Sequence, residues 1–324
     1  MKKYLITGYA GFVGYHFIAY LNSIAKEKNE ILGVDINTPN DFSSWKFDNL
    51  KITHRSINLM DLEEVQSTID DFKPTHIVHL AAFSSVGKSW QQPSEYFSNN
   101  TGIFLNLLES VRDSGVQCKI LNIGSSEEYG FIEENQLPLV EDMRINPANP
   151  YAVTKMVQES MANVYSKGFG MNIISTRSFN HIGPRQRDTF VIASFSKQVA
   201  QAFIDGKKEL DMTTGNLKII RDFLDVRDVV SAYNLLLENG KSGDIYNVCS
   251  GEGISLTEVI NELSNVSGIK ITAHTDLNLV RPNDVSKIIG SNHKLKNDTN
   301  WQRKYTLRQT LTDTFNYWKD YLSK

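Results

Sequence analysis

The chain has 324 residues, of which 40% are hydrophobic and 22% are charged, and its formal net charge at pH 7 is −3. This length suggests two domains or one large composite domain, and the composition is that of a folded globular protein rather than a disordered one. Because there is no basic excess, we expect no nucleic-acid partner and no binding to an anionic membrane surface. The cysteines are Cys118 and Cys249 alone, which excludes a disulfide scaffold and a four-cysteine zinc site and favours a reducing, cytoplasmic location.

The first residues imitate a signal peptide, since two lysines precede an apolar run. Thr7, Gly8 and Gly11 interrupt that run, so we reject the signal-peptide interpretation. No segment reaches the roughly 18 uninterrupted apolar residues of a transmembrane helix, and we expect no membrane span.

Short β-type runs alternate with helical patterns through the first half of the chain. The pattern predicts strands at 4–7, 31–35, 52–57, 76–82, 119–125 and 171–179, and helices at 12–26, 61–71, 94–114 and 150–168. The helix at 61–71 begins with a capping-box pattern, in which Asp61 is followed by Glu64. Such alternation predicts an α/β fold with a doubly wound, Rossmann-type parallel sheet that has helices on both faces.

After residue 180 the pattern becomes less regular. It predicts an amphipathic helix within 221–240, a strand at 244–251, and helices at 255–267 and 306–322. We therefore expect a smaller mixed α/β C-terminal domain for the substrate. The predicted dinucleotide-binding domain comprises residues 1–177 and about 222–249, and the predicted substrate domain comprises about 178–221 and 250–324.

The acidic and histidine residues of the second half do not suggest a metal site. Asp222, Asp225 and Asp228 resemble a metal-binding run, but at the start of a predicted helix they are better explained as capping residues. The histidines show no metal-ligand spacing. We predict no metal.

A glycine-rich loop follows the first predicted strand and begins the first predicted helix. Gly8, Gly11 and Gly14 are spaced as G-x-x-G-x-x-G, with Phe12 and Val13 inside the motif. The first glycine permits a tight turn, the second permits close approach of a pyrophosphate, and the third permits close packing of the helix on the sheet. Asp35 ends the second strand, where a carboxylate binds a ribose 2′-hydroxyl and repels a 2′-phosphate. The sequence therefore predicts a dinucleotide site that favours NAD(H), with NADP(H) possible.

Tyr151 and Lys155 are four residues apart on a predicted helix, so their side chains share one face. An ammonium beside a phenol favours the phenolate and lowers its pKa, which suits proton transfer to a sugar oxygen. The spacing alone is common by chance. Its position after a strand that ends in Ser125 makes it informative, because the carboxyl ends of parallel strands converge on the cofactor crevice.

The glycine loop, the Ser125 segment and the Tyr151/Lys155 pair together resemble an extended short-chain dehydrogenase/reductase acting on nucleotide sugars. Longer segments are similar to the GDP-4-dehydro-6-deoxy-D-mannose reductase family, which makes GDP-D-rhamnose. These segments are HLAAFSSVGKSW (79–90), IGSSEEYG (123–130), NPYAVTK (149–155), FNHIGPRQRDTFVIASFSKQVA (179–200), RDFLDVRDVV (221–230), IYNVCSG (245–251) and IGSNHKLKNDTNW (289–301).

The resemblance implies roles for particular residues. Tyr151 is the implied catalytic acid, Lys155 holds the nicotinamide ribose, and Ser125, with Ser126, orients the 4-keto oxygen. Glu127 is the position at which the related dehydratases have a base. Further implied cofactor contacts are Asn58, Leu59, Leu80, Ala81, Ala82, Asn100, Ile123, Phe179 and His181.

The substrate side is likewise implied by the resemblance. Arg221, Arg281 and Lys197 are the implied anchors of the GDP group, and Asp284 is suited to ribose hydroxyls. A diphosphate is well bound by guanidinium forks and a lysine point charge. The other implied substrate contacts are Ser85, Val86, Asn180 and Val191, and Arg185 and Arg187 are candidates for the same rim.

The sequence leaves three alternatives to a reductase open. Glu127 keeps a GDP-sugar 4,6-dehydratase in consideration, a nucleotide-sugar 4-epimerase is a weaker possibility, and a non-catalytic nucleotide-binding or dimerisation protein is a third. Relatives of this kind commonly form homodimers by a four-helix bundle. In this chain the bundle would use the helices around 97–114 and 151–168.

Overall fold

The computed structural model describes the whole chain except residue 40 and residues 277–284. Its largest element is a seven-stranded sheet in the order β10-β6-β5-β4-β1-β2-β3, in which every pair is parallel. The order reverses at β1, so the predicted doubly wound, Rossmann-type sheet is confirmed. The strands are β1 (Lys3–Thr7), β2 (Asn29–Asp35), β3 (Leu50–Ser56), β4 (His76–His79), β5 (Lys119–Ser125), β6 (Asn172–Ser178) and β10 (Ile245–Val248).

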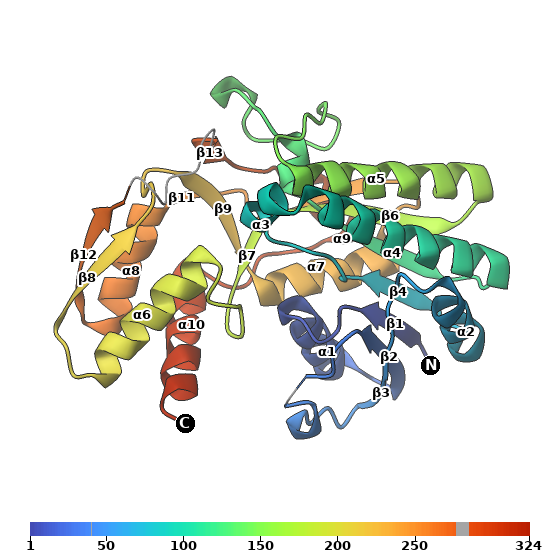
Figure 1. The fold of residues 1–324 in the computed structure, drawn as a ribbon, viewed down its shortest axis with the longest axis horizontal. Coiled ribbons are helices and arrows are strands. Elements are labelled where there is room, and N and C mark those ends of the chain that lie inside the picture. The colour runs from blue at the N-terminus through green and yellow to red at the C-terminus, as the bar shows by residue number, and fades with distance from the viewer. Residues whose placement is uncertain (40, 277–284) are drawn as a thin grey trace.

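Helices cover both faces of this sheet (Figure 1). Residues of β1 show how one strand serves two layers, because Tyr4 and Ile6 belong to one buried cluster and Leu5 to another. Alternate side chains of a strand point to opposite faces, which explains why these strands are apolar throughout. One face carries α1 (Phe12–Ile24), α7 (Val226–Asn239) and α9 (His293–Thr299); the other carries α2 (Leu62–Phe72), α3 (Val86–Gln91), α4 (Pro93–Ser114) and α5 (Pro150–Phe169).

The second half of the chain adds two small sheets at the left of Figure 1. In the first, β9 (Ile220–Asp225) pairs with β7 (Asn180–Ile182), β11 (Gly253–Ser255) and β13 (Lys287–Ile288). In the second, β8 (Glu209–Thr214) pairs with β12 (Lys270–Thr275). A separate apolar cluster joins them to the helices α6 (Val191–Ile204), α8 (Leu256–Ser267) and α10 (Leu307–Leu322).

Two details of the sequence prediction, the end of one strand and one capping box, are wrong. The strand predicted at 76–82 ends at His79. The helix predicted within 221–240 is confirmed as α7, which begins at Val226 directly after β9. Asp61 caps α2 as expected, but the carboxylate of Glu64 accepts a hydrogen bond from the backbone of Asn58 instead of completing a capping box.

The three aspartates around β9 bind backbone amides. Asp225 caps α7 by accepting a hydrogen bond from the Arg227 amide at 2.8 Å. Asp222 and Asp228 instead hold distant loops, at 250–251 and 304–305 respectively. Within the described ranges there is no group of three His, Cys, Asp or Glu side chains that could hold a metal ion. Nor does any helix in these ranges have the length and apolar character needed to cross a bilayer.

Candidate active site

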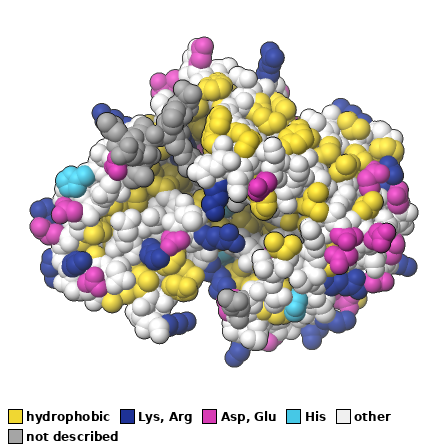
Figure 2. All heavy atoms as spheres, in the orientation of Figure 1, with side chains coloured by type: hydrophobic (Ala, Val, Ile, Leu, Met, Phe, Trp, Pro, Cys, Tyr) yellow, Lys and Arg dark blue, Asp and Glu magenta, His cyan; other side chains and the backbone are white. Residues whose placement is uncertain are grey.

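A cleft of about 1780 Å³ lies where the carboxyl ends of the parallel strands face the small sheets. Figure 2 shows this hollow between the two halves of the molecule, with basic side chains at its centre. The carboxyl ends of β1, β2, β4, β5 and β6 contribute to its lining, as do β9 and α6. It lies at the edge of a doubly wound sheet where ligands are expected to bind.

The glycine loop forms one end of the cleft. Gly8 has a φ of +68°, and a Cβ there would lie 2.7 Å from the backbone nitrogen of Ala81. We expected Gly14 to permit close packing of the helix on the sheet. A Cβ at Gly14 would instead lie 2.4 Å from the carbonyl oxygen of Tyr9, so this glycine permits α1 to pack against its own loop. Gly11 is the N-cap of α1 and provides no side chain to cap the first turn.

This end of the cleft fits a dinucleotide. The first turn of α1 lines the cleft, where its uncapped N–H groups can bind a pyrophosphate. Asp35 lines the same region, and its carboxylate accepts hydrogen bonds from Ala10 at 3.3 Å and Asn37 at 3.2 Å. The other predicted cofactor residues that line the cleft are Gly8, Gly11, Phe12, Val13, Gly14, Asn58, Leu59, Leu80, Ala81, Ala82, Ile123, Tyr151, Lys155, Phe179 and His181.

Asn100 does not line the cleft but lies behind its wall. Its side-chain oxygen accepts a hydrogen bond from the Phe83 amide at 2.8 Å, and its amide nitrogen donates to the Phe83 carbonyl at 3.1 Å. The same nitrogen lies 3.0 Å from the hydroxyl of Thr154 on α5. The residue therefore holds cleft-lining backbone rather than facing a ligand.

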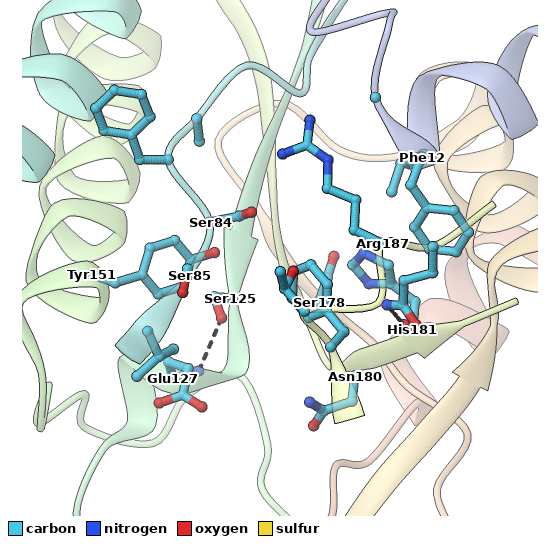
Figure 3. Close-up of a pocket in the computed structure, with 18 of the residues that line it drawn as sticks. Phe12, Ser84, Ser85, Ser125, Glu127, Tyr151, Ser178, Asn180, His181 and Arg187 are labelled. Carbon is cyan, nitrogen blue, oxygen red and sulfur yellow. Dashed lines mark hydrogen bonds between the residues drawn. The ribbon is translucent and has the colours of Figure 1, made fainter. Parts of the chain in front are cut away.

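The candidate catalytic groups meet where β5 ends and α5 begins (Figure 3). Ser125 ends β5 and caps the short 3-10 helix η2 (Ser126–Tyr129). Tyr151 and Lys155 lie on the first turns of α5, which Asn149 caps. The Lys155 ammonium donates hydrogen bonds to the Ile123 carbonyl at 2.7 Å and to Gln158 Oε1 at 2.9 Å.

The electrostatics of this pair differ from the sequence prediction. Burial raises the pKa of Tyr151 above its ordinary value, and this effect exceeds the opposing hydrogen bond with Ser125. Burial also lowers the pKa of Lys155 to about 8. The predicted lowering of the tyrosine pKa by lysine is therefore wrong for this state of the protein, because the ammonium lies 6.0 Å from the phenol ring centre and desolvation dominates.

The predicted substrate residues divide into three groups. Those that line the cleft are Ser85, Val86, Ser126, Glu127, Asn180, Val191 and Arg221. Lys197 is absent from the lining; its ammonium pairs with Asp188 at 2.7 Å. Arg281 and Asp284 lie outside the described residues.

The two arginines proposed for the rim also separate. Arg187 lines the cleft, as Figure 3 shows. Arg185 instead pairs with Asp41 at 2.6 Å and lies over the Tyr15 ring at 3.9 Å. It therefore connects the loop after β7 to the loop after β2.

Sequence reasoning missed three polar residues around the catalytic groups. Glu128 accepts a hydrogen bond from the Ser125 amide at 2.7 Å, and Asn149 donates one to Glu127 at 2.8 Å. Gln158 binds the Lys155 ammonium. The spacing of three between Lys155 and Gln158 was the available signal for that contact, since residues so placed are neighbours on a helix.

Comparison with known proteins decides the family. A model of the GDP-mannose 4,6 dehydratase family matches residues 5–314. The chain belongs to this family. Its members are extended short-chain dehydrogenases/reductases, and the chain is accordingly an NAD(P)-dependent enzyme of the nucleotide-sugar class.

The chain is similar to relatives that have several different activities. It is 33% identical to a GDP-6-deoxy-D-mannose reductase of Pseudomonas aeruginosa over 98% of the chain and 97% of the relative. It is 29% identical to a UDP-glucose 4-epimerase of Corynebacterium glutamicum, over 96% of the chain and 94% of the relative. Among solved structures, RMD from Pseudomonas aeruginosa in complex with NADPH aligns with a TM-score of 0.83 at 30% identity, covering 99% and 98% of the two chains.

Proposed function

We propose that the protein reduces the C4 keto group of a GDP-4-keto-6-deoxyhexose to give a GDP-6-deoxyhexose such as GDP-D-rhamnose. The observation that carries this proposal is the position of the buried Tyr151 with Ser125 in the cleft, where burial raises the pKa of the phenol and favours its protonated form. A proton donor is what reduction of a ketone requires. The 33% identity to a GDP-6-deoxy-D-mannose reductase over almost the whole chain supports the choice of substrate.

In the proposed reaction, Ser125 and Tyr151 both bind the keto oxygen. A reduced nicotinamide bound at the glycine loop would supply the hydride for C4. Tyr151 would give its hydroxyl proton to the keto oxygen, which becomes the new hydroxyl group. The Lys155 ammonium donates two of its three N–H groups in hydrogen bonds to Ile123 and Gln158, which leaves one N–H group to donate to the nicotinamide ribose. Burial keeps the tyrosine protonated until the keto oxygen takes the proton.

The remaining cleft residues provide the proposed binding of both ligands. Asp35 is suited to a ribose diol and repels a 2′-phosphate, so we propose NAD(H) as the preferred cofactor. Arg221 and Arg187 line the substrate side, where guanidinium groups can bind the GDP diphosphate. We expect the enzyme to act in the cytoplasm, where Cys118 and Cys249 remain as free thiols.

The first test follows reduced-nicotinamide absorbance with purified enzyme and GDP-4-keto-6-deoxymannose, using NADH and NADPH in parallel. We expect loss of one equivalent of cofactor per GDP-6-deoxyhexose formed, faster with NADH. Substituting Tyr151→Phe removes the proton donor and should lower kcat by roughly a hundredfold or more. Full turnover by this variant would overturn the mechanism.

A second candidate function is GDP-sugar 4,6-dehydration. Glu127 favours it, because its carboxylate lines the cleft two residues from Ser125 and is suited to removing a C5 proton. Incubation with GDP-mannose and no added reductant separates the two reactions. A 4-keto product there, with no consumption of reduced cofactor on the keto sugar, would assign the enzyme to the dehydratases.

We also propose a homodimer formed by α4 and α5, which pack side by side (Figure 1). These helices leave large apolar side chains in solvent, with Val164 59% exposed and Phe169 53% exposed. Phe97 and Leu105 of α4 are likewise exposed. A second copy of the same helix pair would bury these side chains in a four-helix bundle.

A further inference from the structure

A chain of hydrogen bonds joins the end of β5 to the start of α5. The Glu127 amide donates to Ser125 Oγ at 3.2 Å, and Glu127 Oε2 accepts from Asn149 Nδ2 at 2.8 Å. Asn149 Oδ1 in turn accepts from the Ala152 amide in the first turn of α5 at 2.9 Å. Tyr151, on the first turn of α5, lines the cleft together with Ser125 and Glu127 (Figure 3).

The two ends of the Asn149 side chain perform different tasks. Its oxygen caps α5, a task that serine or aspartate performs equally well. Its nitrogen donates to Glu127, a bond that requires a donor on the same side chain as the capping acceptor. The residue is only 8% exposed, so this orientation is fixed by its surroundings.

Glu127 is held from one side only. Asn149 occupies its Oε2, while its Oε1 has no hydrogen-bond partner among the residues that the structure describes. The side chain lines the cleft beside Ser125 (Figure 3). The free oxygen is therefore available to a hydroxyl group of the sugar.

We propose that Asn149 is a positioning residue that, through Glu127, sets the separation of the Ser125 and Tyr151 hydroxyls and directs the free Glu127 oxygen toward the sugar. This inference rests on the proposed function, because it concerns how the two hydroxyls are held on the keto oxygen. In the proposed function the nucleotide is bound elsewhere in the cleft, by Arg187 and Arg221. Loss of the amide donor should therefore affect kcat much more than KM.

The test uses two substitutions that separate the tasks of Asn149. Asn149→Ser keeps a capping oxygen but removes the amide donor, whereas Asn149→Ala removes both. We expect Asn149→Ser to melt close to the wild-type temperature with kcat roughly tenfold lower and KM nearly unchanged. Asn149→Ala should show the same loss of kcat and a lower melting temperature as well. Wild-type kcat in Asn149→Ser would overturn the proposal.

A double-mutant cycle tests whether the effect passes through Glu127. If it does, Asn149→Ser should cost little further activity in a Glu127→Ala background, because the bond is already lost. Fully multiplicative losses in the double variant would contradict the proposal. The reaction of the wild-type enzyme is established first, which tests the reductase assignment by itself. The double-mutant cycle is then measured with that reaction.

A crystal structure of Asn149→Ser provides a readout that needs no activity. We expect the separation between Ser125 Oγ and Tyr151 Oη to increase relative to the wild-type protein. An unchanged separation, with Glu127 in its original orientation, would show that Asn149 does not position these groups and would overturn the proposal.

Discussion

Glu128 is a carboxyl group enclosed within the protein directly beneath the candidate catalytic serine. It is 0% exposed; its Oε1 accepts a hydrogen bond from the Ser125 amide, and its Oε2 has no partner in the part of the chain that the structure describes. It also uses space that only glycine leaves, since a Cβ at Gly124 would lie 2.5 Å from Oε1. Burial and the nearby Glu159 raise the pKa of Glu128, against the weaker effects of Arg177 and Lys155. We infer that this carboxyl is neutral in the folded protein.

Substitution of Glu128→Gln should change how stability depends on pH. The unfolded chain releases the Glu128 proton near the ordinary pKa of about 4.3, whereas the folded protein releases it at higher pH. Between these values the folded state binds more protons, so wild-type stability falls as pH rises. Glutamine keeps the acceptor for Ser125 and does not titrate. Urea unfolding from pH 5 to pH 8 should therefore show the variant gaining stability relative to wild type, and parallel curves would contradict a neutral Glu128.

At the scale of elements, the meeting of β1, α1 and β4 depends on Gly8. The left-handed backbone and the 2.7 Å approach to Ala81 both exclude a side chain there. Gly8→Ala should force β4 away from the loop, with loss of cofactor binding and a lower melting temperature. Gly115→Ala is the matched control, because Gly115 has a similar φ of +63° but open space around its Cβ position. It should cost only about 1 kcal/mol of strain and leave cofactor affinity, measured by titration of reduced-nicotinamide fluorescence, unchanged.

The elements also explain how far the sequence could predict this fold. The strands of the large sheet are buried on both faces and alternate with long helices, so their periodicity is strong. The strands of the small sheets lack that signal. β13 has two residues, β11 has three, and β8 is half-exposed, so their existence depends on pairing with β9 and β12 rather than on local pattern.

The candidate site shows the same contrast between residues on the large sheet, which the sequence predicts, and residues elsewhere, which it predicts less well. The glycine loop, Ser125 and Tyr151 follow from strand ends and helix starts, which the sequence identifies. Lys197, which the resemblance implied as a GDP anchor, is not among the cleft-lining residues, whereas Ser194 and Gln198 of α6 are. Asn149 and Glu128 were missed because their partners lie on a different element or are backbone amides.

At the scale of the whole molecule, the proposed dimer depends on an apolar face that is exposed in a single chain. Figure 2 shows hydrophobic side chains gathered at the upper right, where Figure 1 places α5. Val164→Glu introduces a charge on this face and should convert the dimer to a monomer in sedimentation velocity at micromolar concentration. Ile24→Glu, an exposed site at the end of α1 on the other side of the sheet, is the control and should remain dimeric. A wild-type protein that sediments only as a monomer would contradict the dimer.

The edge strand β10 links the completion of the large sheet to a late stage of synthesis. It pairs with β6, yet some sixty residues that build parts of the small sheets separate the two in the chain. α7, which packs against α1, lies within that stretch and is therefore also made after β6. A nascent chain that ends soon after β6 would therefore expose an unpaired strand edge and an uncovered apolar face. We therefore expect fragments that end near residue 180 to aggregate, because they lack both β10 and α7. The large sheet is complete only after much of the smaller half has been synthesised.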